Sequence, residues 1–188
     1  MSTTMLRFAG FGGQGIIKAG EILGMAAVAD GKRALQNQSY GSSARGGLCT
    51  SDVCISAGEI HEIEPEEFDV LVALSQDSCA AFLRQLRPGG TLIYEEDLVK
   101  IPEGYAGQAH AIPATRIAAQ DLGRRIVTNM VVLGFCGAVT GLVSRLSLER
   151  TVEKNVPPGT QALNLRAFAE GWGWKSSSRP ALEQDRAW

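Results

Sequence analysis

The stretch Gly10-Phe-Gly-Gly-Gln-Gly15 decides the fold, because an apolar segment ends where it starts and a helical pattern begins where it stops. Residues 5–9 before it are mostly apolar and predict a short buried strand. Residues 16–30 after it carry apolar side chains at helical spacing. A strand, a glycine turn and a helix form the first half of a βαβ unit, whose helix N-terminus can present free N–H groups to an anion.

The glycine pattern leaves the nature of the ligand open. Gly10, Gly12 and Gly15 satisfy G-x-G-x-x-G, the pattern of dinucleotide-binding units. Such units also place an Asp or Glu at the end of the second strand, about 20 residues on, to bind the ribose hydroxyls. The second strand expected here, residues 33–38, ends in amides and Ser39. Three interpretations remain: glycines that serve packing alone, a site for NAD or FAD, and contact with another phosphate-bearing ligand or a neighbouring subunit's active site.

Chain length and composition indicate one globular domain. The chain has 188 residues, of which 45% are hydrophobic and 20% charged, and its 22 glycines suit an α/β fold with many tight turns. A formal net charge of −2 and the lack of a basic stripe in the sequence argue against a nucleic-acid partner. We expect the domain over residues 1–172 and a C-terminal extension over 173–188, whose tryptophans indicate docking on another surface.

The cysteines indicate a reduced, cytoplasmic protein without a metal site of its own. Cys49, Cys54, Cys79 and Cys136 include no C-x-x-C pair and no zinc or iron–sulfur spacing, so we expect buried thiols. We expect no secretory leader, because the first strand follows the start of the chain directly. The longest apolar run, residues 130–139, is too short and too rich in glycine to cross a membrane.

The remaining patterns predict a mostly parallel or mixed sheet. Residues 69–75 form a continuous apolar run, which is typical of a central strand covered on both faces. The other expected strands are 48–56, 60–63 as the hairpin partner of 48–56, 91–94 and 109–112. The expected helices are 78–86, 113–122, 130–143 capped by Thr128 and Asn129, 148–156, and a last helix that Thr160 caps and that ends at Gly171. The predicted architecture is a three-layer, Rossmann-like α/β fold in a single domain.

Two polar segments are expected beside the glycine turn. Residues 36–47 form a long polar loop, in which Arg45 can form a bidentate contact to a phosphate or carboxylate. Ser75 and Gln76 follow the central strand, and ligands of open α/β sheets lie at the carboxyl ends of strands. Both residues are therefore expected in the same crevice as residues 12–15. The sequence contains no Ser/His/Asp set, no H-E-x-x-H motif and no Walker lysine, so no catalytic or metal-ligating residue is predicted.

Three ordered motifs resemble the gamma subunit of 2-oxoacid:ferredoxin oxidoreductases. They are Gly10-Phe-Gly-Gly-Gln-Gly15, then Gln38-Ser-Tyr-Gly41 with Ala44-Arg-Gly-Gly47, and then Asp69-Val-Leu-Val-Ala-Leu-Ser-Gln76. The resemblance runs from about residue 6 to 172. Further matching positions are Asn129, Asn164, Ala167, Phe168 and Gly171.

The resemblance implies an enzyme complex of anaerobic metabolism rather than an enzyme active alone. Such complexes convert a 2-oxoacid and coenzyme A to an acyl-CoA and CO₂, and pass electrons to ferredoxin or NAD. Thiamine diphosphate with Mg²⁺ and [4Fe-4S] clusters would lie in the alpha, beta and delta subunits. The gamma-type domain would hold no cofactor by itself, border the active site and help to bind coenzyme A.

The resemblance also implies roles for the polar segments named above. Gly12, Gly13, Gln14 and Gly15 would supply backbone and amide contacts at the shared crevice, and Ser75 and Gln76 would line the same rim. Ser39, Tyr40 and Arg45 would face coenzyme A or the alpha subunit. Two alternatives stay open: a free-standing nucleotide-binding oxidoreductase and a purely structural assembly subunit. The residues do not select the 2-oxoacid.

Overall fold

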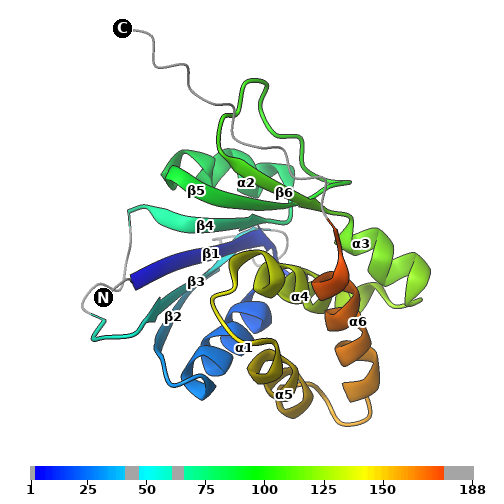
Figure 1. Ribbon diagram of the computed structural model, residues 1–188. Helices are drawn as coiled ribbons and strands as arrows, with labels where there is room; N and C mark the ends of the chain where they lie inside the picture. Colours follow the sequence, from blue (N-terminus) through cyan, green and yellow to red (C-terminus); the bar gives the residue numbers. More distant parts are fainter. Residues whose placement is uncertain (1–2, 41–46, 61–65, 176–188) are drawn as a thin grey trace, which may run out of the picture.

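The computed structural model describes residues 3–40, 47–60 and 66–175, which form one α/β domain (Figure 1). The strands are β1 (Thr3–Phe11), β2 (Arg33–Tyr40), β3 (Leu48–Ser56), β4 (Phe68–Ala73), β5 (Leu86–Glu95) and β6 (Gln108–Ile112). The α-helices are α1 (Ile16–Ala29), α2 (Gln76–Phe82), α3 (Ala114–Arg116), α4 (Thr128–Thr140), α5 (Arg145–Asn155) and α6 (Gln161–Gly173). Three short helical turns, η1 (Leu83–Gln85), η2 (Ile117–Asp121) and η3 (Arg125–Val127), extend or precede them.

The strands make one mixed sheet in the order β2-β3-β1-β4-β5-β6. Strands β1, β4, β5 and β6 are parallel, whereas β3 is antiparallel to both β1 and β2. Strands β1 and β2 run in the same direction and α1 connects them, so the expected βαβ unit is present, but β3 lies between its two strands. The prediction that 60–63 forms the hairpin partner of β3 was wrong at Ile60, which lies outside any strand. The rest of that segment lies outside the described residues.

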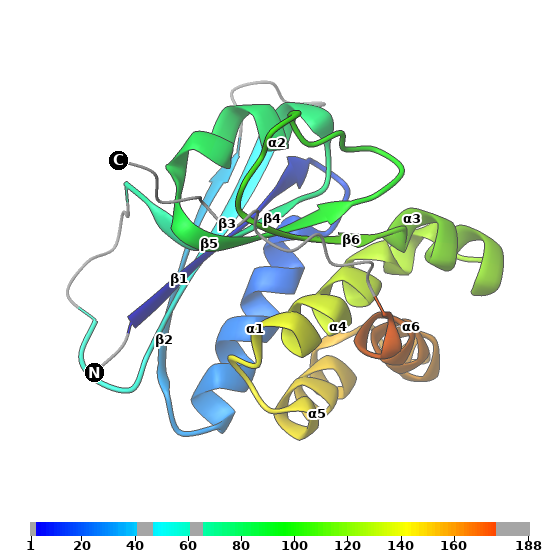
Figure 2. The ribbon, with the colours of Figure 1, turned by 45° about the horizontal axis from the view of Figure 1, so that its top comes forward.

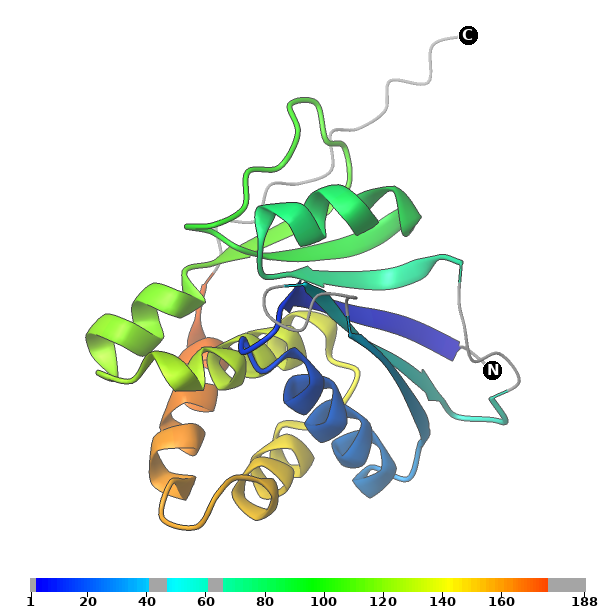
Figure 3. The same ribbon diagram turned by 180° about the vertical axis from the view of Figure 1, so that it is seen from behind.

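Helices cover both faces of the sheet, which gives the expected three-layer architecture. Figure 2 shows α2 on one face and α1 with α4–α6 on the other, and Figure 3 shows the same layers from behind. The larger core lies under α1 and α4, where Phe8, Ile22 and Leu133 are fully buried. A smaller core lies under α2 around Leu71 and Leu92. The central strand β4 is therefore apolar from Val70 to Ala73, because it faces a core on each side.

The glycine at position 20 lets α1 lie close to the sheet. A Cβ on Gly20 would overlap Ser51 Oγ of β3, so any side chain here would push the helix outward. A Cβ on Gly24 would lie 3.8 Å from Val53 Cγ1, which is ordinary contact. Close approach at Gly20 brings the first turn of α1 to the carboxyl edge of β1, where the candidate site lies.

Several predicted boundaries differ for local reasons. Helix α2 begins at Gln76 rather than 78, because Ser75 and Ser78 form a capping box around its first turn. The predicted cap of α4 was wrong: Val127 is its N-cap residue, and Thr128 Oγ1 instead donates to Arg125 O. The strand expected at 91–94 begins earlier, at Leu86, and the pairing of β5 with β4 shifts its register between Phe68 and Val70.

Other expectations concern the chain as a whole. The four cysteines are buried free thiols. Within the described residues, no helix is both long and apolar enough to cross a membrane. Helix α6 ends at Gly173, and residues 176–188 of the expected extension lie outside the described residues, so the division at 172 stays a prediction.

Candidate functional site

The glycine turn leaves β1 at the carboxyl edge of the sheet and enters α1 through left-handed backbone. Gly13 has a φ of 91° and Gly15 a φ of 74°, conformations that residues with a Cβ rarely adopt. No atom lies within 4 Å of the place where a Cβ on Gly13 would stand. Gly12 has no positive φ, and a Cβ there would meet only Cys49 Sγ at 3.7 Å. The turn therefore exposes backbone at Gly13 to whatever occupies the space above it.

Helix α1 begins without any side chain that neutralises its N-terminus. Gly15 is the N-cap residue, no side chain caps the helix, and the first turn holds no acidic residue. A helix of this length carries a partial positive charge at its N-terminus, which favours an anion there. The backbone N–H groups of the first turn are thus available to an acceptor outside the helix.

Gln14 joins the ends of two strands. Its Oε1 accepts a hydrogen bond from Phe11 N at 2.6 Å, and its Nε2 donates to Leu74 O at 3.1 Å. One amide thus connects the end of β1 to the residue that follows β4. Each amide atom has capacity for one further hydrogen bond.

Ser75 and Gln76 lie with Gln14 on one pocket of about 360 Å³, as their positions at strand ends predict. Ser75 is 5% exposed, and its Oγ accepts from Ser78 N at 3.2 Å. The Gln76 amide accepts from Lys100 N at 2.7 Å and donates to Lys100 O at 3.3 Å. The two side chains therefore shape the pocket while their polar atoms also hold α2 and the segment after β5.

The sequence reasoning missed Arg125, which lines this pocket and the next. The second pocket, of about 290 Å³, also includes Gly13, Gln14, Thr115 and Ile126 in its wall. No ion pair of Arg125 occurs among the described residues. Arg125 is exposed and contributes to the walls of both pockets. In the sequence, Arg124 and Arg125 resemble a pair of solvated side chains between two helices. Their position just before the buried helix α4 was the signal that could have marked Arg125 as a site residue.

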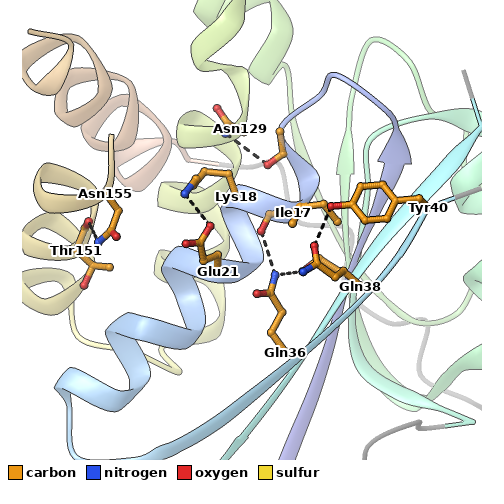
Figure 4. A network of polar contacts seen from close by, with 11 residues as sticks. Ile17, Lys18, Glu21, Gln36, Gln38, Tyr40, Asn129, Thr151 and Asn155 are labelled. Carbon is orange, nitrogen blue, oxygen red and sulfur yellow. Dashed lines mark hydrogen bonds and ion pairs between the residues drawn. The ribbon is translucent and has the colours of Figure 1, made fainter. Parts of the chain in front are cut away.

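Ser39 and Tyr40 lie apart from these pockets, at the end of the edge strand β2. They are not part of the expected loop, because they pair with Thr50 and Cys49 of β3. Tyr40 is 66% exposed, and its hydroxyl donates to Gln38 Oε1 at 3.0 Å (Figure 4). Neither residue lines the two pockets beside the glycine turn. Arg45 lies outside the described residues.

Amide side chains hold the first turn of α1 from two sides, as Figure 4 shows. Gln36 Nε2 of β2 donates to Ile17 O at 3.0 Å and to Ser51 Oγ at 2.7 Å. Asn129 Nδ2 of α4 donates to Gly15 O at 3.4 Å. These bonds fix the position of the glycine turn against the sheet and against α4.

Glu95 is a buried acid behind the second pocket. Its Oε2 accepts from Thr115 N at 2.9 Å and from Thr115 Oγ1 at 3.0 Å. Its Oε1 is buried without a hydrogen-bond partner among the described residues. Burial raises the pKa of the Glu95 carboxyl above its usual range, although the bonds from Thr115 act in the opposite direction. Burial also lowers the pKa of His110 in β6.

Among residues 3–40, 47–60 and 66–175, no group of three or more His, Cys, Asp or Glu side chains could hold a metal ion. Burial raises the pKa of Cys136 to about 12 and also raises that of Cys79, so neither thiol is a reactive thiolate. The arrangement can bind an anion through backbone amides and one guanidinium, but it presents no nucleophile with an adjacent base.

Comparisons with known proteins match this architecture. The family model "Pyruvate ferredoxin/flavodoxin oxidoreductase" matches residues 5–174. The 2-oxoglutarate synthase subunit KorC of Methanocaldococcus jannaschii is 43% identical over 171 residues, which cover 89% of this chain and 91% of that one. The keto/oxoacid ferredoxin oxidoreductase gamma subunit of Geobacter sulfurreducens superposes with a TM-score of 0.83 at 41% identity, covering 92% of this chain and 95% of that one.

A larger solved enzyme shares the fold at lower identity. The 2-oxoglutarate:ferredoxin oxidoreductase of Magnetococcus marinus, solved with 2-oxoglutarate, coenzyme A and succinyl-CoA bound, gives a TM-score of 0.79 at 23% identity. The match covers 91% of this chain and 30% of that chain. At this identity the comparison concerns the fold.

Proposed function

Because this chain belongs to the pyruvate ferredoxin/flavodoxin oxidoreductase family, as a gamma subunit of a 2-oxoacid:ferredoxin oxidoreductase, we propose that it borders the active site of the assembled enzyme and helps to bind coenzyme A. The enzyme converts a 2-oxoacid and coenzyme A to an acyl-CoA and CO₂. The electrons released pass to ferredoxin, or to NAD as the alternative acceptor. The chain contributes binding surface and no chemical group that reacts.

The proposal rests on the residues that line the two pockets beside the glycine turn. We call this surface the anion-binding wall. Gly13 offers exposed backbone, α1 begins without a neutralising side chain, and Arg125 lies where the two pockets meet. Coenzyme A carries a diphosphate and a 3′-phosphate, which such groups recognise without a ribose-binding acid. This explains why the end of β2 can carry Ser39 and Tyr40 instead of Asp or Glu.

The residues that the structure describes offer no ligand group for the metal-containing cofactors of the reaction. The thiols of the chain are buried, and no described cluster of ligands could hold a metal ion. We therefore place thiamine diphosphate with Mg²⁺ and the [4Fe-4S] clusters in the alpha, beta and delta partners. In this arrangement the coenzyme A thiol reaches from this chain towards a reaction centre that other subunits hold.

We propose 2-oxoglutarate as the first 2-oxoacid to test, because the relative from Methanocaldococcus jannaschii is a 2-oxoglutarate synthase subunit. The experiment is mild affinity purification of this chain with its native partners, followed by partner identification and a visible spectrum. Dye reduction would then be measured with 2-oxoglutarate, pyruvate and branched-chain 2-oxoacids, each with and without coenzyme A. We expect a brown complex whose reduction of the dye requires coenzyme A. A colourless chain without partners would overturn the proposal.

A purely structural assembly subunit is the second candidate. It is favoured by the internal hydrogen bonds of Gln14, Ser75 and Gln76, which would exist even if no ligand bound. A free-standing NAD- or flavin-dependent enzyme is disfavoured, because the strand-end acid is missing from β2. The coenzyme A dependence of an Arg125 variant, described in the Discussion, separates the structural role from the binding role.

A further inference from the structure

The segment between β6 and α4 carries two residues of the anion-binding wall. Thr115 lies at its start, in α3, and Arg125 lies near its end, in η3. Both residues line the second pocket. Between them the chain passes through η2 and turns at Gly123, which has a φ of 67°. The position of Arg125 therefore depends on how residues 114–124 are held against the rest of the domain.

Glu95 holds the start of this segment. It is the last residue of β5 and is only 1% exposed. Its Oε2 accepts hydrogen bonds from Thr115 N at 2.9 Å and from Thr115 Oγ1 at 3.0 Å. The N–H groups in the first turn of a helix have no partner inside that helix, so a side chain from the sheet supplies the acceptor here. Two bonds from a buried carboxyl thus fix Thr115 in the wall of the pocket.

Backbone hydrogen bonds extend this fixed position to Arg125. Arg124 N donates to Ala118 O at 2.9 Å, and Ala118 is fully buried in the larger core. Val127 N then donates to Arg124 O at 3.2 Å, and Thr128 Oγ1 donates to Arg125 O at 2.7 Å. These bonds close the turn that contains Arg125. The backbone of this turn is therefore connected, bond by bond, to the helical segment that begins at Glu95.

A second contact of the same segment lies at the surface. Arg116 Nη2 lies 3.5 Å from Glu96 Oε2, and Arg116 Nη1 lies 3.6 Å from Asp97 Oδ1. The Arg116 side chain is 48% exposed. Long, exposed ion pairs of this kind contribute little to stability. The buried bonds from Thr115 to Glu95 are therefore the stronger attachment.

We propose that Glu95 is a positioning residue, which holds Thr115 and thereby sets the backbone from which Arg125 reaches a bound anion. Glu95 lines neither pocket of the wall and acts only through these residues. Its role requires an acceptor oxygen rather than a negative charge, because an amide oxygen can accept the same two bonds. This inference rests on the proposed function, since it takes Arg125 to be the residue that binds the anion.

The test compares Glu95→Ala with Glu95→Gln in the assembled oxidoreductase, with the 2-oxoacid saturating. Glu95→Ala should raise the KM for coenzyme A about three- to tenfold and change kcat less than about twofold, because a displaced contact weakens binding without touching the reacting atoms. Glu95→Gln should restore the KM, because its amide oxygen replaces the acceptor. Arg116→Ala is the matched control, since it removes only the exposed contact of the same segment and should leave the KM unchanged.

Two further measurements distinguish positioning from a general loss of stability. In an Arg125→Ala background, Glu95→Ala should raise the KM no further, because the residue that it positions is gone. Hydrogen exchange at the Arg124 amide, which donates to Ala118 O, should be at least about threefold faster in Glu95→Ala. General destabilisation would instead speed exchange in β1 and β4 as well. If Glu95→Ala does not assemble, Thr115→Val removes one of the two bonds without creating a cavity, and the same exchange is measured.

The outcomes separate this inference from the proposed function. A higher KM in Glu95→Ala that glutamine reverses, and that disappears in the Arg125→Ala background, supports the positioning role. An unchanged KM in Glu95→Ala, equal increases in the alanine and glutamine variants, or additive increases in the double variant would overturn the inference alone. An unchanged exchange rate at Arg124 in Thr115→Val would do the same. An unchanged KM in Arg125→Ala itself overturns the proposed function, and this inference with it.

Discussion

The side-chain amide of Asn129 at the start of α4 lies against Gly15, the left-handed residue that begins α1. Its Nδ2 donates to Gly15 O at 3.4 Å, across 114 residues of sequence. A Cβ on Gly15 would overlap this amide. The two helix N-termini are therefore held together at a position where only glycine fits, next to the pockets proposed for coenzyme A.

Gly15→Ala should destabilise the chain more than Gly31→Ala. Both glycines have positive φ, 74° and 77°, so alanine suffers the same backbone strain of about 1–2 kcal/mol at either position. Only at Gly15 does the new Cβ also meet Asn129, since nothing lies within 4 Å at Gly31. Urea unfolding of the purified chain measures both free energies of unfolding. Equal losses in the two variants would contradict a tight contact between Gly15 and Asn129.

Arg125→Ala should raise the KM for coenzyme A about tenfold and leave kcat nearly unchanged. The expected loss of coenzyme A binding corresponds to the removal of one charge-assisted contact to a phosphate in a partly exposed site. Arg124→Ala is the control, because this neighbouring arginine lines neither pocket of the anion-binding wall. Steady-state assays of the assembled enzyme, with the 2-oxoacid saturating, measure the effect. An unchanged KM in an intact complex would favour the purely structural role.

Glu95→Gln should gain stability relative to the unaltered chain as pH rises. The folded-state pKa of Glu95 is raised, so below about pH 4.3 the residue is protonated in both states and has no effect. As pH rises above that value, the unfolded chain loses the proton first, and the stability of the unaltered chain falls until pH passes the folded-state pKa. The glutamine variant does not lose stability in this way, because its side chain carries no ionisable proton.

Denaturation of both chains between pH 4 and pH 8 checks this prediction. Glu96→Gln is the control, because the Glu96 side chain is 44% exposed and pairs only loosely with Arg116 at 3.5 Å. This variant measures the effect of removing an exposed carboxyl beside Glu95. A pH-independent difference for Glu95→Gln would show that the carboxyl is not held neutral by burial.

Gln14→Glu should destabilise the chain by about 1–3 kcal/mol. The carboxylate can still accept from Phe11 N, but it faces Leu74 O, which loses its donor and repels the new charge. Gln38→Glu on the exposed end of β2 is the matched control for adding a negative charge. The free energy of unfolding of the two variants provides the comparison. A similar small effect in both would mean that the Gln14 amide does not hold β1 to β4.

The elements that depend on local pattern could be predicted from the sequence. The glycine turn between β1 and α1 follows from Gly10 to Gly15, and the central strand β4 follows from its continuous apolar run. Ser75 and Gln76 could be placed at the carboxyl edge, because every parallel strand of such a sheet ends there. These features depend on backbone conformation and periodicity, which neighbouring residues determine.

The tertiary structure alone decided which segments meet. Strand β3 inserts between β1 and β2, and Arg125 lines the same pocket as Gly13 although it lies far from it in the sequence. Three asparagines, Asn129 of α4, Asn155 of α5 and Asn164 of α6, line one pocket together with Lys18. Strand pairing and hydrogen bonds between distant side chains depend on how the chain packs. A local sequence pattern does not indicate which distant segment will lie beside it. The sequence by itself determined the fold class and the turn, whereas packing determined the wall that this turn shares with α4 and the pockets around it.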